Sequence, residues 1–194
     1  MSEQQSGVES REPKVGGSAE AAYKAPRWAW WVATGFASGY LKPAPGTWGS
    51  LAAVLLWLVW RQLVWDWPGA WLGGWLYYGI IPAMVLTWIA IRSSDAVCEE
   101  SGLKDPAFIV IDEWAGQWFA LVPLWLFLNL KAPPIFLDWR VLVPFFFFRL
   151  FDIWKPGLIR KLQVLPGGLG VVIDDVAAGF YAALCTALVL PLLR

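Results

Sequence analysis

The sequence contains no histidine and few charged residues. The lack of an imidazole excludes mechanisms that need a histidine base, a phosphohistidine or a histidine-ligated metal. Charged residues make up 15% of the 194 residues, whereas soluble domains carry about 25%. The two cysteines, Cys98 and Cys185, have no metal-type spacing and do not indicate a disulfide framework. The formal net charge is zero, so no basic surface suggests nucleic acid as a partner.

Apolar and aromatic residues are abundant instead. The chain is 58% hydrophobic, with 16 Trp and 11 Phe, and its mean hydropathy is +0.53. A transmembrane helix needs roughly 20 largely apolar residues. The segments that meet or approach this requirement are 47–64, 70–91, 114–130, about 133–152 and 176–193. The sequence therefore predicts an all-α, polytopic membrane helix bundle of about four to five spanning or partly spanning helices.

The two ends of the predicted bundle differ in charge. Eleven Lys and Arg residues fall on the side that carries the N-terminus and the loops near 42–46, 92–110 and 149–172, against four on the other side. This bias predicts that the first side is cytoplasmic. Residues 1–27 are polar and are predicted to be a disordered cytoplasmic tail, followed by a single membrane domain over 28–194. The segment 28–41 is short and is expected either to dip into the interface or to cross.

Three segments that are distant in sequence bring carboxylates to the predicted cytoplasmic face. They contribute Asp112 and Glu113, then Asp152, and finally Asp174 and Asp175. Two cations accompany them. Arg149, Asp152 and Lys155 are spaced i, i+3 and i+6, which places them roughly on one side of a helix. Charges at membrane depth usually face a cavity or a partner.

Each motif also has a plain structural explanation. Asp112 with Glu113, and Asp174 with Asp175 after a flexible turn at Gly167–Gly170, could act as acids at helix starts. The charges at 149–155 could form an intrahelical ion pair with a snorkelling lysine. In the loop at 46–50, Thr47 or Ser50 could be an ordinary N-cap, or Gly46, Thr47 and Ser50 could bind an anion.

The combination of these motifs points to phosphate chemistry. Five carboxylates near two cations would repel one another without compensation. A divalent metal resolves this repulsion, and all-oxygen ligands favour Mg²⁺. Arg149 and Lys155 beside a metal suit a phosphate group, and the site opens at the level of lipid headgroups. A phospholipid with a cytoplasmic phosphate is the substrate that these features predict.

Four separated segments resemble the bacterial phosphatidylglycerophosphatase A family. They are "GFASGYLKPAPGTWGSLAA" at 35–53, "ESGLKDPAFIVIDEWAGQW" at 100–118, "FFRLFDIWKPGLIRKL" at 147–162 and "GGLGVVIDDVAAG" at 167–179. The resemblance implies a Mg²⁺-dependent membrane phosphatase that converts phosphatidylglycerophosphate to phosphatidylglycerol and inorganic phosphate. It also implies a multi-pass protein of the bacterial inner membrane whose site faces the cytoplasm. The family's motif positions fall here on Gly46, Thr47, Ser50, Asp105, Asp112, Glu113, Arg149, Asp152, Lys155, Asp174 and Asp175.

From these positions we expect the following roles. Glu113, Asp152, Asp174 and Asp175 are the expected Mg²⁺ ligands, and Asp112, Glu113, Asp152 and Asp175 the expected catalytic carboxylates. The expected substrate-binding residues are Arg149, Lys155, Gly46, Thr47 and Ser50. Either a carboxylate accepts the proton of an attacking water, or an aspartate attacks phosphorus directly.

Other functions stay open at this point. One is a phosphatase for a different membrane lipid phosphate. A second is a small transporter, although a transporter would spread its acidic residues through the depth of the membrane. A third is a cytidine-diphosphate-alcohol transferase, but its signature "DGxxAR…GxxxDxxxD" does not occur in the sequence. The sequence leaves the oligomeric state open.

Overall fold

The computed structural model describes residues 23–64, 74–127 and 139–193. Most of the predicted tail, and parts of the predicted spans at 70–91, 114–130 and 133–152, lie outside these residues. Across the described ranges the chain is helical and contains no strand. The α-helices are α1 Arg27–Ala33, α2 Pro45–Val64, α3 Ile81–Ser101, α4 Ile111–Leu121, α5 Leu124–Phe127, α6 Leu142–Trp154, α7 Leu158–Leu162 and α8 Gly167–Val189.

Three helices are long and apolar enough to cross a membrane. They run over Pro45–Val64, Trp75–Ser101 and Gly167–Leu193, the second beginning with a π-helical turn and the third ending in a 3₁₀ turn. Helices α4 and α6 have 11 and 13 residues, fewer than the roughly 20 needed to span. The prediction of an all-α membrane bundle with spanning and partly spanning helices is confirmed.

The boundaries of the helices follow from local sequence. Pro45 is the first residue of α2, where its fixed φ and missing N–H suit a helix start. Helix α3 ends at Ser101 and is followed by Gly102, which adopts the left-handed conformation with φ 67°. Helix α6 stops at Trp154, because the residue before Pro156 is disfavoured in a helix. These helix boundaries place the polar segments before α2, after α3 and after α6 at one end of the bundle.

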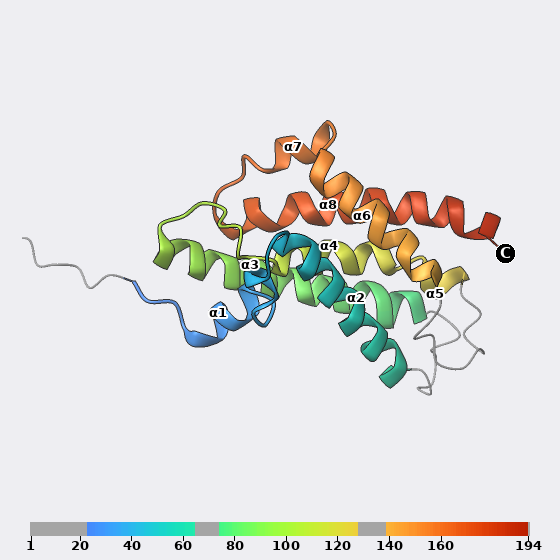
Figure 1. Ribbon diagram of the computed structural model, residues 1–194, viewed down its shortest axis with the longest axis horizontal. Coiled ribbons are helices and arrows are strands. Elements are labelled where there is room, and N and C mark those ends of the chain that lie inside the picture. Colours follow the sequence, from blue (N-terminus) through green and yellow to red (C-terminus); the bar gives the residue numbers. More distant parts are fainter. Residues whose placement is uncertain (1–22, 65–73, 128–138, 194) are drawn as a thin grey trace, which may run out of the picture.

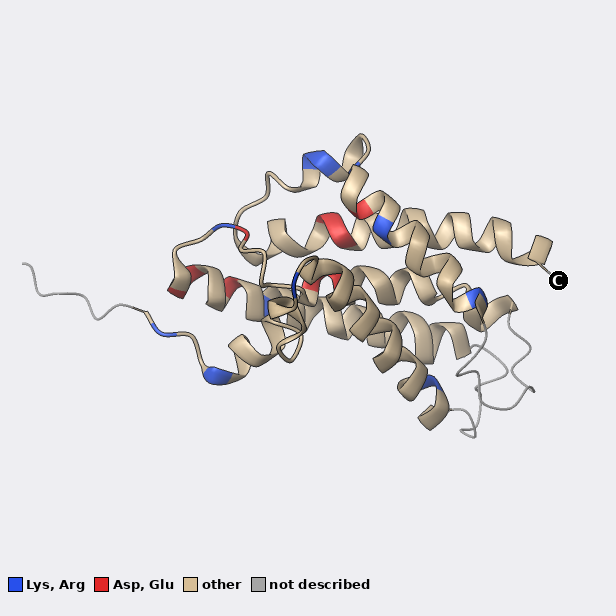
Figure 2. Ribbon diagram, viewed as in Figure 1, with Lys and Arg blue, Asp and Glu red and all other residues tan. Residues whose placement is uncertain are grey.

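Helix α4 lies in the centre of the bundle (Figure 1), in contact with α2, α3, α6 and α8. All of its residues except Glu113 are buried. The starts of α2, α4 and α8 share one end of the molecule with the ends of α3 and α6. Figure 2 shows that most of the described charged residues gather toward this end and along the middle of the bundle. The site predicted from sequence lies there.

Two glycines bring α4 and α8 into backbone contact. A Cβ on Gly179 would collide with the Gly116 carbonyl, and one on Gly116 would collide with the Asp175 carbonyl and the Phe148 ring. Glycine is therefore required at both positions for the two helices to approach this closely. This crossing sets Asp175 of α8 beside the first turn of α4.

The segment 28–41 does not span. Its only α-helix, α1, has seven residues, about 10 Å at 1.5 Å per residue, and it continues into turns and a 3₁₀ helix at Ser38–Tyr40. Trp28, Trp31 and Phe36 are exposed on it. Exposed aromatic side chains on a short helix are typical of an element at the membrane–water interface.

Candidate active site

A pocket of about 330 Å³ lies at the charged end of the bundle. It collects residues from the start of α2, the loop before α4, the first turn of α4, the end of α6 and a position two turns inside α8. Its lining residues are Ala44, Pro45, Gly46, Asp105, Ala107, Ile109, Asp112, Glu113, Arg149, Asp152, Lys155 and Asp175. Segments that are far apart in sequence therefore meet here, as expected.

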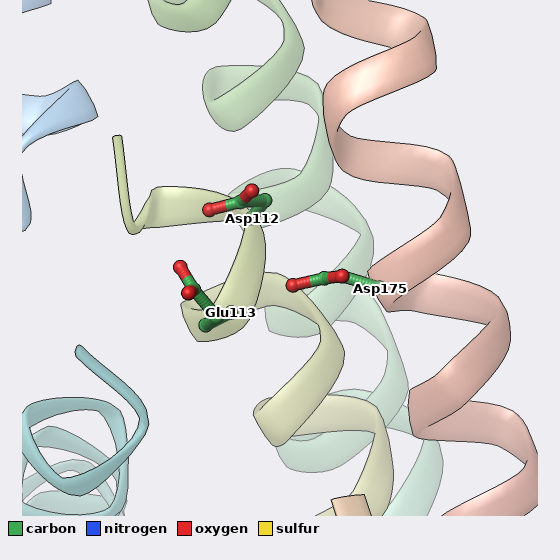
Figure 3. A group of neighbouring side chains, drawn as sticks. All are labelled: Asp112, Glu113 and Asp175. Carbon is green, nitrogen blue, oxygen red and sulfur yellow. The ribbon is translucent and has the colours of Figure 1, made fainter. Parts of the chain in front are cut away.

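Three of the carboxylates form one group. Oxygen atoms of Asp112, Glu113 and Asp175 all lie within 4.8 Å of one another, and Figure 3 shows the side chains from α4 and α8 converging on a common space. Asp112 and Asp175 are buried. Asp112 Oδ1 and Glu113 Oε2 are buried without a hydrogen-bond partner among the described residues. Buried carboxylate oxygens without partners are unfavourable, and a cation bound between these three side chains would offset that cost.

Arg149 connects the group to two neighbouring helices. Its Nη1 lies 2.5 Å from Asp152 Oδ2 and 4.0 Å from Glu113 Oε1. The same nitrogen donates to Ser50 Oγ at 3.3 Å, and Ser50 Oγ donates to the Gly46 carbonyl at 2.8 Å. Arg149 is thus held from α2 and from its own helix, with its guanidinium at the pocket wall.

Lys155 reaches the site through an unusual backbone conformation. It follows the last residue of α6 with φ 46°, in the left-handed region, and its ammonium lies 2.6 Å from Asp174 Oδ2. Asp152 Oδ1 and Asp175 Oδ1 are each 3.8 Å away. Burial by itself lowers the pKa of an ammonium, but Asp175 and the hydrogen bond to Asp174 outweigh it and raise the pKa of Lys155. Lys155 is therefore a fixed positive charge at neutral pH.

The predicted carboxylates divide into two sets. Asp112, Glu113 and Asp175 form the group described above, whereas Asp152 and Asp174 face the cations Arg149 and Lys155. Asp174 is not among the described residues that line the pocket, and its Oδ2 accepts a hydrogen bond from the Lys155 ammonium. In this geometry Asp152 and Asp174 contact Arg149 and Lys155, and their expected role as Mg²⁺ ligands stays a prediction.

The glycine-rich segment before these aspartates differs from the expected turn. Gly168 and Gly170 belong to the first turn of α8, which begins at Gly167. Gly168 is buried against α3, where its N–H donates to Asp95 Oδ1 at 2.5 Å. Asp174 and Asp175 consequently lie two turns inside α8, about 10 Å from its start, and no acid occupies the first turn. An effect at a helix start does not explain them; Asp112 and Glu113 do lie in the first turn of α4.

The residues expected in a loop at 46–50 lie instead in the first turns of α2, and they contribute unequally to the site. Among the described lining residues Gly46 is present, and a Cβ on it would collide with Glu113 Oε1 and lie 3.2 Å from both terminal nitrogens of Arg149. Ser50 is fully buried and acts through Arg149. Thr47 is half-buried and is not part of the described pocket lining. The absence of a side chain at Gly46 lets Glu113 and Arg149 lie close to the backbone of α2, and this contact explains the motif better than a helix N-cap does.

The arrangement suits a phosphate ester bound between a cation site and two fixed positive charges. The group of Asp112, Glu113 and Asp175 offers only oxygen donors, including the two unpartnered atoms, and this set fits Mg²⁺. Arg149 and Lys155 stand on the neighbouring wall of the same pocket. Neither histidine nor cysteine lines the described pocket.

Comparisons with known proteins agree with this chemistry. The model of the family described as phosphatidylglycerophosphatase A matches residues 31–190. Proteins named phosphatidylglycerophosphatase A are 34% identical over 154 residues in Escherichia coli, covering 78% of this chain and 77% of theirs, and 32% identical over 158 residues in Haemophilus influenzae, covering 79% and 83%. The chain belongs to the phosphatidylglycerophosphatase A family. It is a membrane phosphatase, as the four motifs predicted.

A further relative bears a different substrate name. A protein of Bacteroides thetaiotaomicron, named as a candidate phosphatidylinositol-3-phosphatase, is 32% identical over 161 residues, which cover 80% of this chain and 89% of that protein. No solved structure matches the chain significantly.

Several functional positions have no clear signal in the sequence. Gly116 and Gly179 look like ordinary small residues of apolar helices, and only the backbone contact between α4 and α8 shows their importance. Asp95 is an exposed acid on α3 that also accepts the N–H of Gly168, a contact that the sequence does not indicate. The family motif had already marked Asp105, which lines the pocket.

Proposed function

We propose that this protein hydrolyses the terminal phosphate monoester of phosphatidylglycerophosphate, giving phosphatidylglycerol and inorganic phosphate, with Mg²⁺ as the cofactor. The observation that carries the proposal is the position of the three-carboxylate group Asp112, Glu113 and Asp175 beside Arg149 and Lys155 in one pocket. Membership of the family and the names of two relatives support the choice of substrate.

Asp112, Glu113 and Asp175 would hold the Mg²⁺. When bound, Mg²⁺ acidifies a water molecule and polarises the phosphoryl group. Arg149 and Lys155 bind the phosphate oxygens and neutralise charge that develops on them. Asp152 and Asp174 keep these two cations in place through the contacts at 2.5 and 2.6 Å.

The reaction is a displacement at phosphorus. The oxygen of water forms the new bond to phosphorus while the bond to the glycerol oxygen breaks, and a carboxylate of the group accepts the proton of the water. The departing glycerol oxygen takes up a proton and becomes the hydroxyl of phosphatidylglycerol. In the alternative, Asp112 or Asp175 attacks phosphorus first and the aspartyl-phosphate is hydrolysed in a second step. Acid quenching during turnover distinguishes the two routes, because only the second one forms a covalent phospho-enzyme that can be trapped.

The experiment that tests this function is phosphate release by the purified full chain from a panel of lipid phosphates, with Mg²⁺ and with chelator. We expect phosphatidylglycerophosphate to be turned over fastest, and chelator to abolish turnover until Mg²⁺ is restored. Comparable rates on phosphatidate or a prenyl phosphate would contradict the substrate assignment. Full activity in chelator would contradict the cofactor.

A second substrate, phosphatidylinositol 3-phosphate, belongs in the same panel. The Bacteroides relative matches this chain about as well as the two phosphatidylglycerophosphatases do. Both lipids present a phosphate monoester at headgroup level, so the pocket chemistry accepts either. A higher kcat/KM for phosphatidylinositol 3-phosphate than for phosphatidylglycerophosphate would make the inositol lipid the preferred substrate and contradict the first proposal.

We also place the protein in the bacterial inner membrane with the pocket facing the cytoplasm, on the basis of its Lys and Arg distribution. Lys42 lies exposed close to the start of α2 at the charged end. In a background with Cys98→Ser and Cys185→Ser, an impermeant thiol reagent should label Lys42→Cys in inverted vesicles and not in intact spheroplasts. The opposite pattern would reverse the orientation.

A further inference from the structure

A second cavity, of about 340 Å³, lies away from the catalytic pocket between the N-terminal segment and α3. Its described lining comprises Tyr23, Pro26, Trp28, Trp88, Ile89, Arg92 and Ala96, and none of these residues lines the catalytic pocket. The cavity is therefore a separate feature, which we call the α1–α3 groove.

Glu100 at the end of α3 fixes the outer wall of the α1–α3 groove. Its Oε2 accepts hydrogen bonds from the Ala25 N–H at 3.2 Å and from Trp30 Nε1 at 2.5 Å. These bonds hold the start of α1 against α3, where the two helices lie close together (Figure 1). The groove thus has two defined walls.

Arg92 is the charged residue among the described residues that line the groove. Arg92 stacks over the Trp88 ring at 5.9 Å, and no carboxylate of the described residues is within ion-pair distance of it. Lys24 and Arg27 are exposed on the N-terminal segment but do not belong to the described lining of the groove. On α3, Glu100 is engaged with Ala25 and Trp30, and Asp95 with the Gly168 N–H. An anion in the groove would find in Arg92 a guanidinium without an ion-pair partner among the described residues.

An exposed apolar stripe on α3 runs from Arg92 along the helix toward its start. Ile81, Val85 and Trp88 are 42%, 52% and 62% exposed, and their spacing places them on the same side of the helix as Arg92. Ile81 lies eleven residues from Arg92, about 16 Å along the helix axis. One leaflet of hydrocarbon is about 15 Å thick. Arg92 therefore lies at headgroup level when the stripe faces acyl chains.

We propose that the α1–α3 groove binds an anionic phospholipid, with the phosphodiester at Arg92 and one acyl chain along Ile81–Trp88. The aromatic walls from Trp28 and Trp88 suit the interface between headgroup and chain. The site is distinct from the catalytic pocket and does not depend on the substrate of that pocket. It gives the enzyme a resident lipid that bridges α1 and α3.

The test uses a lipid that is neither substrate nor product of the proposed reaction. Native mass spectrometry of the full chain in detergent compares phosphatidylserine with phosphatidylcholine at equal concentration. We expect one phosphatidylserine to be retained in preference to phosphatidylcholine. We expect Arg92→Gln to reduce that preference about tenfold, the smallest effect of losing one charge-assisted contact. Arg160→Gln, which removes an exposed cation on α7 outside the groove, should keep the wild-type preference for phosphatidylserine.

A second pair of variants tests the chain-binding stripe. Val85→Gln should also weaken retention of phosphatidylserine, whereas Val59→Gln, at a similarly exposed valine on α2, should not. Equal binding of both lipids by the wild type, or unchanged selectivity in Arg92→Gln, overturns the proposal. So does displacement of the lipid by inorganic phosphate at equal concentration, or a lipid-free dimer that Arg92→Gln disrupts. Unaltered phosphate release by Arg92→Gln shows that the variant is folded.

Discussion

Lys155 and Asp174 are joined by an ion pair of 2.6 Å that connects the end of α6 to a position two turns inside α8. Asp174 is 2% exposed, and it does not belong to the described pocket lining, whereas Lys155 does. This pair separates two possible roles for Asp174. As a Mg²⁺ ligand it would set the metal requirement, whereas as the partner of Lys155 it sets how phosphate is bound.

The first prediction concerns Asp174→Asn. Because Lys155 loses the negative charge of its closest partner and, among the described residues, keeps the carboxylates of Asp152 and Asp175 at 3.8 Å, we expect KM to rise about tenfold, equivalent to the loss of about 1.4 kcal/mol. The Mg²⁺ concentration for half-maximal rate should stay within twofold of the wild type. Steady-state kinetics at several Mg²⁺ concentrations measure both quantities. A large increase in the Mg²⁺ requirement would make Asp174 a ligand after all.

The second prediction concerns the three-carboxylate group. Asp175→Asn and Asp112→Asn each remove a charge from the proposed Mg²⁺ site while preserving side-chain size. We expect each to reduce kcat/KM by about 100-fold or more, in line with removal of a group that acts on the reacting phosphate, and to raise the Mg²⁺ requirement. Mg²⁺ titrations of phosphate release provide the measurement.

Asp105→Asn is the matched control for these two variants. Asp105 lines the same pocket but is exposed and does not belong to the described group of three. Its effect on the Mg²⁺ requirement should be much smaller. If Asp105→Asn and Asp175→Asn have the same effect, the metal site is not centred on Asp112, Glu113 and Asp175.

The third prediction compares Ser50 with Thr47. The hydroxyl of Ser50 accepts from Arg149 at 3.3 Å, so Ser50→Ala should lower kcat/KM by about fivefold, the effect of losing about 1 kcal/mol of hydrogen bonding. Thr47→Ala should leave it within twofold, because Thr47 is not part of the described pocket lining. Phosphate release by the two variants measures the difference. A larger loss of kcat/KM in Thr47→Ala than in Ser50→Ala would indicate that Thr47 contacts the substrate.

Much of the fold was predictable because a bilayer imposes a simple pattern. Apolar runs of sufficient length predicted the helices that begin at Pro45, Trp75 and Gly167, and the distribution of Lys and Arg identified the charged end. The boundary at Gly167 was harder to predict. Glycines usually indicate a turn, but Gly168 lies within α8. Glycine is needed there because a Cβ would collide with the backbone of α3.

The residues of the site were predictable in kind, but their partners were not. An acid near a membrane end is visible in the sequence, and so are Arg149 and Lys155. Which acid contacts which cation depends on the left-handed conformation of Lys155 and on the depth of Asp174 and Asp175 within α8. Periodicity along one helix predicted contact between Arg149 and Asp152. It gave no information about the contact between Lys155 and Asp174.

The final prediction tests the crossing of α4 and α8. A Cβ at Gly116 would meet the Asp175 carbonyl and the Phe148 ring, so Gly116→Ala must push α8 away from α4 and carry Asp175 away from Asp112 and Glu113. Overpacking of this kind costs about 1–3 kcal/mol, and we expect a lower Tm in detergent together with a raised Mg²⁺ requirement. Ala183→Ser adds one atom at a half-buried position of α8 and should change neither. A Gly116→Ala protein that keeps its wild-type Mg²⁺ requirement despite a lower Tm would show that the crossing supports the fold without positioning the carboxylates.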